Sequence, residues 1–152
     1  MLRDDLNLAL KSAMKAKETR STTTLRLIMA AIKDRDIAAR EKSNFDGIDD
    51  QEILALLQKM VKQRRESIDI YEKAGRTDSA QQEREEIEVI ERFLPRAMSE
   101  EEIAEAVAKV IEETEASSVK DMGKVMAQLR SLYTGQMDFG KASGLIKERL
   151  CS

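Results

Sequence analysis

Arg64 falls on the apolar side of a predicted helix, where a charged group needs a partner. It lies four residues after Met60 and four before Ile68, within a stripe that the helix is expected to bury. The stripe consists of Ile53, Leu57, Met60, Ile68 and Tyr71. An unpaired charge there would cost several kcal/mol. After a turn at Gly75 the next helix runs back antiparallel, which brings Glu83 level with Arg64. The spacing therefore predicts an Arg64–Glu83 ion pair.

Two interpretations of this pair are open. In the first, it is a buried structural ion pair that fixes the register of two helices. In the second, it is a carboxylate–guanidinium site ready to receive a ligand. We favour the structural interpretation, because a buried charge on a helix stripe needs a partner whether or not a ligand binds.

Other reactive groups are scarce in this sequence. It contains no His, which removes the commonest general base and metal ligand and every Ser–His or Cys–His pair. The single Cys151 stands next to the last residue, and the six glycines form no phosphate-binding loop. Glu83, Glu85, Glu86 and Glu88 are expected to form a helix surface with Glu83 as its one buried member. We predict no catalytic residue, no cofactor and no metal.

Composition and charge narrow the classes of protein further. A chain of 152 residues with 41% hydrophobic and 36% charged residues makes one ordinary domain or two small ones. The net charge of −3 excludes a strongly basic nucleic-acid-binding protein but allows a basic face. One cysteine fits a reducing cytoplasm, and no apolar run suits a signal peptide or a membrane span. We expect a monomer.

The apolar periodicity predicts an all-α protein with a boundary at Pro95. An amino-terminal bundle of about four helices occupies residues 1–95, and a smaller three-helix domain occupies residues 96–152. The second helix should begin at Ser21 or a nearby Thr. The third should open with a capping box over residues 49–52, and the fourth should be capped by Thr77 or Asp78 and run to Leu94.

The carboxyl-terminal part carries similar helix signals. Ser99 and Glu102 form a second capping box, and Ser118 with Asp121 can cap the following helix. Gly123 lies inside that helix, where it lowers helix propensity by about 1 kcal/mol. We therefore expect it to permit close packing or the approach of another backbone. The last helix follows a turn at residues 135–138.

The amino-terminal segment is the most basic part of the chain. Residues 1–42 hold 10 basic and 6 acidic side chains, a net charge of +4. The basic residues along the second predicted helix are Arg20, Arg26, Lys33, Arg35, Arg40 and Lys42. They form a stripe that could meet phosphates. The alternative, which we favour, is a solvated face on which Asp34, Asp36 and Glu41 are interleaved. On the first helix, Arg3, Lys11 and Lys15 are expected to be solvated.

Four runs of this sequence resemble the YqeY family of small bacterial proteins. They are KQRRESIDIYEKAGRTD, EREEIEVIERFLP, SEEEIAEAVAKVI and DMGKVMAQL, in this order and with no long insertion. That family shares its fold with the tail of the B subunit of the glutamine-dependent aminoacyl-tRNA amidotransferase, GatB. In the GatB tail, the matching three-helix unit contacts tRNA.

The resemblance implies an RNA-binding role for one end of the last domain. Residues that could face an RNA backbone are Lys120, Gly123, Lys124, Lys141 and Lys147. Lys120 and Lys124 flank the start of a helix, whose free N–H groups attract phosphate. The alternative is that Met122, Val125 and Met126 are plain core and the lysines are solvated.

Three functions follow as hypotheses. The first is a non-catalytic accessory module that binds tRNA or docks onto a tRNA-modifying enzyme. The second is a carbon–nitrogen ligase with glutamine as the amide donor, which the family label suggests. We disfavour it because the chain lacks the large domain that precedes the GatB tail and has no nucleotide-binding loop. The third is a protein-interaction scaffold.

Overall fold

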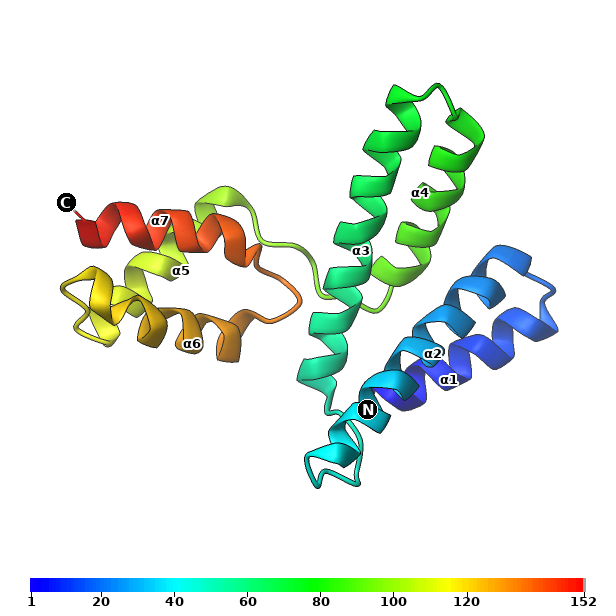
Figure 1. The fold of residues 1–152 in the computed structure, drawn as a ribbon, viewed down its shortest axis with the longest axis horizontal. Helices are drawn as coiled ribbons and strands as arrows, with labels where there is room; N and C mark the ends of the chain where they lie inside the picture. The colour runs from blue at the N-terminus through cyan, green and yellow to red at the C-terminus, as the bar shows by residue number, and fades with distance from the viewer. Residues whose placement is uncertain (152) are drawn as a thin grey trace. The chain divides into compact units, whose positions relative to one another are not determined.

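The computed structural model describes residues 1–151, which form seven α-helices and one 3-10 turn without any β-strand (Figure 1). The predicted all-α fold is therefore confirmed. The chain divides into two compact units, Met1–Leu94 and the part from Pro95 onward. Each unit has its own hydrophobic core. The assignment of residues 1–95 and 96–152 to two domains stays a prediction.

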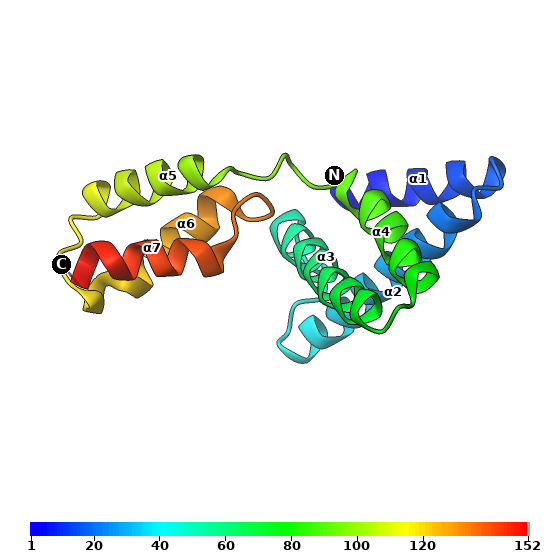
Figure 2. The same ribbon diagram turned by 90° about the horizontal axis from the view of Figure 1, so that it is seen from above.

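The amino-terminal unit consists of two antiparallel helical hairpins (Figures 1 and 2). The first pairs α1 (Leu2–Lys15) with α2 (Thr19–Glu41), and the second pairs α3 (Asp50–Lys73) with α4 (Thr77–Glu91). The hairpins pack on each other chiefly through α2 and α4. Their fully buried side chains include Leu6, Ile28, Ile32, Ile53, Leu57 and Ile90. These recur at helical spacing, so burial of one face of each helix builds this core.

A polar cluster joins α1, α2 and the loop before α3, and it corrects the expectation that Arg3 is solvated. The Arg3 guanidinium donates to both carboxylate oxygens of Asp36, at 2.8 and 3.0 Å, and to the carbonyl of Ile48 at 3.1 Å. Asp36 also accepts from the Ile48 N–H at 2.9 Å. Asp36 is thus not part of a solvated face. The hydrogen bond from Arg3 holds the pKa of Asp36 below its usual range.

The start of α2 agrees with the prediction of Ser21 or a nearby Thr. The helix begins at Thr19, so its three successive threonines lie inside it. Thr24 is buried, and its hydroxyl donates to the Arg20 carbonyl at 2.8 Å. That bond satisfies the hydroxyl within the helix, which explains how a poor helix former is tolerated there.

The α3–α4 hairpin confirms the predicted turn at Gly75. The predicted cap of α4 and the predicted burial of Ile68 and Tyr71 are corrected. Gly75 has φ +72°, the left-handed conformation expected just after a helix. The residue capping α4 is Arg76, without a side-chain hydrogen bond, so neither Thr77 nor Asp78 is the cap. Ile68 and Tyr71 are only half-buried, because they lie towards the hairpin end, beyond the core.

The carboxyl end of α4 also lies earlier than expected. The helix ends at Glu91 rather than Leu94. The N–H groups of Phe93 and Leu94 bond to carbonyls three residues back, which tightens the chain into a turn. Pro95 disfavours helical backbone at the residue before it, and this accounts for the early end.

The carboxyl-terminal unit is a three-helix bundle of α5 (Glu100–Glu113), α6 (Met122–Tyr133) and α7 (Phe139–Cys151), with the 3-10 turn η1 (Val119–Asp121) before α6. Helices α5 and α7 run in the same direction and α6 runs opposite to both (Figures 1 and 2). The predicted capping box of α5 is confirmed, with Ser99 and Glu102 exchanging two hydrogen bonds of 3.1 Å. Asp138 caps α7 through the Gly140 N–H at 2.9 Å.

Gly123 does not have the packing role expected of it within the chain. It is exposed, and a Cβ built on it would meet no atom within 4 Å. The unit's core instead takes Val125 and Leu129 from α6, with Met122 and Met126 partly buried against it. The glycine therefore leaves the backbone at the start of α6 open to solvent.

Candidate functional site

Arg64 lies between two carboxylates of α4. Its Nε donates to Oε2 of Glu86 at 3.0 Å, and Oε2 of Glu83 lies 3.9 Å from the same nitrogen. The side chains of Arg64, Glu83 and Glu86 are 14%, 21% and 8% exposed. Arg64 also donates to the Met60 carbonyl of its own helix at 3.3 Å. Glu83, named from the sequence, is therefore close to Arg64, but Glu86 makes the direct hydrogen bond.

Glu86 was assigned to the helix surface from the sequence, and this assignment is wrong. Its position carries a signal that could have found it. It lies three residues before Val89 and four before Ile90, and both of these residues are buried. A charged residue on a buried stripe needs a partner, as Arg64 does, so the position of Glu86 indicates that it is paired.

The two carboxylates are not electrostatically equivalent. Burial, followed by the nearby charge of Glu86, raises the pKa of Glu83 above its ordinary value. The guanidinium thus faces one carboxylate that bonds to it directly and another that is driven towards its neutral form. With its donors directed at groups of its own hairpin, this cluster is suited to fixing the register of α3 and α4.

The amino end of α6 gathers part of the predicted RNA-binding set. Lys120 in η1 and both Gly123 and Lys124 in the first turn of α6 are exposed. The Lys124 ammonium lies 3.4 Å from the Thr114 carbonyl. Asp121 stands among them, and its Oδ2 accepts from the N–H groups of Ser117 and Ser118 at 2.9 and 3.3 Å. Those bonds lower the pKa of Asp121.

The other two lysines of the set lie on α7. Lys141, in the first turn of that helix, forms an ion pair with Glu100 at 3.3 Å. Lys147 is exposed in the second half of α7, which packs against η1. Since α6 and α7 are antiparallel, Lys141 lies at the opposite end of the bundle from Lys120. The structure therefore does not gather the five residues into one cluster.

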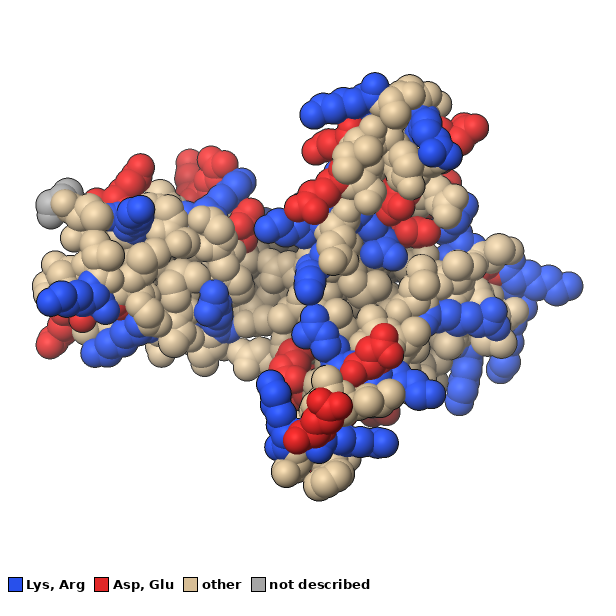
Figure 3. Space-filling model, in the orientation of Figure 1, with Lys and Arg blue, Asp and Glu red and all other residues tan. Residues whose placement is uncertain are grey.

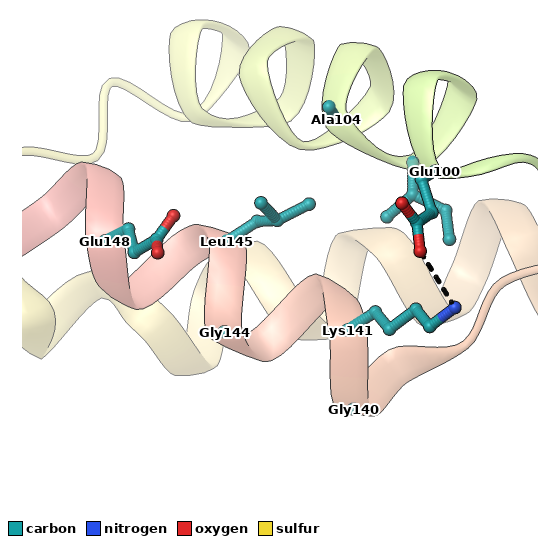
Figure 4. A pocket seen from close by; sticks show the side chains of 8 residues that line it. Glu100, Ala104, Gly140, Lys141, Gly144, Leu145 and Glu148 are labelled. Atoms are coloured by element: carbon teal, nitrogen blue, oxygen red, sulfur yellow. Dashed lines mark hydrogen bonds and ion pairs between the residues drawn. The ribbon is translucent and has the colours of Figure 1, made fainter.

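A shallow groove of about 400 Å³ separates α5 from α7 (Figure 4). Its lining consists of Glu100, Ile103, Ala104, Gly140, Lys141, Gly144, Leu145 and Glu148. The Lys141–Glu100 ion pair closes one end, and the floor is apolar or glycine. No hydroxyl, thiol or imidazole lines it, and the groove offers an apolar contact surface flanked by charged side chains.

Neither a metal-binding cluster nor a helix suited to span a bilayer occurs in residues 1–151. No group of three or more Cys, Asp or Glu side chains there is placed to hold a metal ion. None of the helices in this part of the chain has both the length and the apolar character that a bilayer span requires.

The described residues thus form an all-α fold of two helical units, with a paired arginine in one and exposed lysines at a helix start in the other. A family model described as "Yqey-like protein" matches residues 3–150. The chain belongs to this YqeY-like family, which confirms the resemblance read from the sequence.

Among curated proteins, the similar ones are named "Altered inheritance of mitochondria protein 41, mitochondrial". The Eremothecium gossypii protein is 34% identical over 146 residues, which is 94% of this chain and 77% of the relative. The Clavispora lusitaniae protein is 32% identical over 155 residues, covering 99% and 86%. A Saccharomyces cerevisiae protein is 26% identical over 132 residues, covering 86% and 66%. The similarity thus extends over both helical units.

Proposed function

We propose that the chain is a non-catalytic accessory module that binds tRNA, alone or beside a tRNA-modifying enzyme. The observation that carries this proposal is the exposed group of Lys120, Gly123 and Lys124 at the amino end of α6. Two cations there flank a helix start, where backbone N–H groups and the helix dipole favour a phosphate. Gly123 has open space in place of a side chain, so a phosphate could approach the backbone closely.

The neighbouring side chains are compatible with this proposal. Asp121 would repel a phosphate, but its Oδ2 is turned back towards the N–H groups of Ser117 and Ser118. Lys147, in the carboxyl-terminal half of α7, is a further exposed cation on the helix that packs against η1. Lys141 would contribute only after leaving Glu100. Lys120 and Lys124 are accordingly the central pair of the proposed contact.

The compartment and the alternative activity belong to the same proposal. The relatives' name places those proteins in mitochondria, so we propose a reducing compartment, either the cytoplasm or the interior of a mitochondrion. The ligase alternative comes from the family label alone, and no observation on residues 1–151 favours it. It would require glutamine-dependent amide transfer by the purified chain, abolished in Glu83→Gln.

Labelled total tRNA, titrated with the full chain at 50 and 200 mM salt, tests the proposal. We expect salt-sensitive binding that falls at least tenfold in a Lys120→Glu, Lys124→Glu double variant, because two phosphate contacts become repulsive. A matched control, Lys59→Glu with Lys62→Glu, changes the net charge equally at exposed positions of α3. Equal loss in the control, or no loss in the lysine variant, would refute this site.

A further inference from the structure

Helix α2 carries three exposed cations at seven-residue intervals, Arg26, Lys33 and Arg40. We call this row the α2 basic stripe. A step of seven residues is nearly two turns of an α-helix and about 10.5 Å along its axis. The three side chains therefore follow an almost straight line about 21 Å long, drifting by about 20° per step. The positions between them on the same face, Ala30 and Ile37, are also exposed, so the row is open along its length.

The cations of the stripe are not used inside the fold. No carboxylate of residues 1–151 lies within ion-pair distance of any of the three. Arg26 reaches only the sulfur of Met14, at 3.9 Å. Arg40 contributes to lowering the pKa of Asp36, but Asp36 already receives both bonds of Arg3.

Several other arginines of this unit form ion pairs. Arg20, on the same helix, pairs with Glu85 of α4 at 3.1 Å, and Arg64 pairs with Glu86. Asp34 and Glu41, which follow Lys33 and Arg40 in the sequence, are exposed and make no ion pair with the stripe. The stripe is therefore a row of three cations without an ion-pair partner among residues 1–151.

The surface near the amino end of α2 has the same sign. Residues 1–42 have a net charge of +4, and blue side chains predominate over the ends of α1 and α2 near their connecting turn (Figure 3). Lys11 and Lys15 of α1 are exposed as the sequence predicted. A partner of this surface must be anionic over a length comparable to the helix.

We propose that the α2 basic stripe binds the phosphate backbone of a structured RNA. The inference rests on the proposed function and gives the same RNA a second contact surface, on the amino-terminal unit. A row of evenly spaced cations suits a chain of evenly spaced phosphates, and two of the three are arginines, which bind phosphate in a bidentate manner.

A membrane surface fits the stripe less well. Binding in a bilayer interface requires a wide apolar face beside the cations. The large apolar side chains Leu25, Ile28 and Ile32 of α2 are buried in the core of the unit. Ile37, half exposed, is the one large apolar residue in line with the cations. Leu27 is exposed to a similar extent, and these two residues do not make the wide apolar face that insertion requires.

The test compares the full chain with a triple variant, Arg26→Glu, Lys33→Glu and Arg40→Glu. The control is Lys59→Glu, Lys62→Glu and Lys73→Glu, three exposed lysines of α3 with the same change in net charge. Binding of labelled tRNA is measured across a salt series. Each phosphate contact contributes about 0.7 to 0.9 to the slope of log K against log salt, so losing three contacts should flatten that slope by about 2 to 3. The control should keep the wild-type slope.

Several results would overturn the inference. An unchanged salt slope in the stripe variant refutes it, as does an equal flattening in the control. Stripe-dependent binding to phosphatidylserine vesicles, with tRNA binding unaffected, would reassign the stripe to membranes. If the wild-type chain binds no tRNA, both proposals fail. If binding is lost only in the Lys120, Lys124 variant, the stripe inference is refuted and the proposed function stands. Thermal melting checks folding, and the corresponding triple glutamine variant replaces any variant that unfolds.

Discussion

At the scale of single residues, Arg64 shows how one buried charge selects its neighbours. Glu86 accepts the direct hydrogen bond from Arg64. Glu83 lies nearby, where burial and the charge of Glu86 raise its pKa. We propose that this cluster is structural and fixes the register of the α3–α4 hairpin. Its two carboxylates should then respond oppositely to neutralisation.

Glu86→Gln should lower the free energy of unfolding by about 1.5 to 3 kcal/mol, because Arg64 loses its charge-assisted hydrogen bond. Glu83→Gln should not lower it at pH 7. Since the folded-state pKa of Glu83 is raised, its ionised form costs stability above that pKa, and the cost disappears as the pH falls towards its ordinary value near 4.3. Urea denaturation at pH 5 and 7 measures both effects. A larger loss for Glu83→Gln than for Glu86→Gln would contradict them.

Asp36 gives a second prediction, with the opposite sign. Its folded-state pKa is lowered by the hydrogen bond from Arg3, so it contributes stability above its ordinary pKa near 3.9. That contribution is lost as the pH falls through the folded-state value. Asp36→Asn should therefore destabilise the chain by about 1 to 3 kcal/mol at pH 7, with the deficit shrinking below about pH 4. The control is Asp34→Asn at an exposed neighbouring position, which should have the wild-type free energy of unfolding at pH 7 and below about pH 4.

The residue-level partners were only partly predictable. Antiparallel folding about Gly75 placed residues 83 to 87 opposite Arg64, but a one-turn uncertainty in register cannot separate Glu83 from Glu86. Arg3 and Asp36 are 33 positions apart, and their pairing depends on how α1 packs against α2. Helical periodicity contains no information on that packing, so both were assigned to solvated faces.

At the scale of elements, helix existence followed from periodicity and helix ends from local chemistry. The Ser99–Glu102 capping box was predictable because all of its partners lie within four residues. The early end of α4 was not predictable, because the sequence does not show how many residues before Pro95 leave the helical conformation. Local backbone conformation also distinguishes Gly75 from Gly144. A Cβ at either position would meet no atom within 4 Å, but only Gly75 has a positive φ.

Alanine substitution of these two glycines should have opposite effects. Gly144→Ala should stabilise the chain by up to about 1 kcal/mol, because it raises helix propensity inside α7 without a clash. Gly75→Ala should destabilise it by about 1 to 2 kcal/mol, because φ is +72° there. Urea denaturation followed by circular dichroism compares them. Stabilisation by both substitutions, or by neither, would contradict this assignment of their roles.

At the scale of the whole molecule, the charge is distributed so that an acidic protein can still present basic surfaces. The net charge is −3, whereas residues 1–42 carry +4. The exposed lysines at the start of α6 and the α2 basic stripe belong to different helical units, so an RNA contacting both would bind by two independent surfaces. Reversal of either surface should weaken binding, and reversal of both should abolish it at 200 mM salt.

The proposal that this YqeY-like protein binds tRNA is tested most directly by a gel-shift titration of the purified full chain against total tRNA at low and moderate salt. We predict a shift at micromolar protein that weakens steeply between 50 and 200 mM salt, as expected when cations contact phosphates. Absence of a shift at either salt concentration would contradict the proposed function and favour a protein-interaction scaffold.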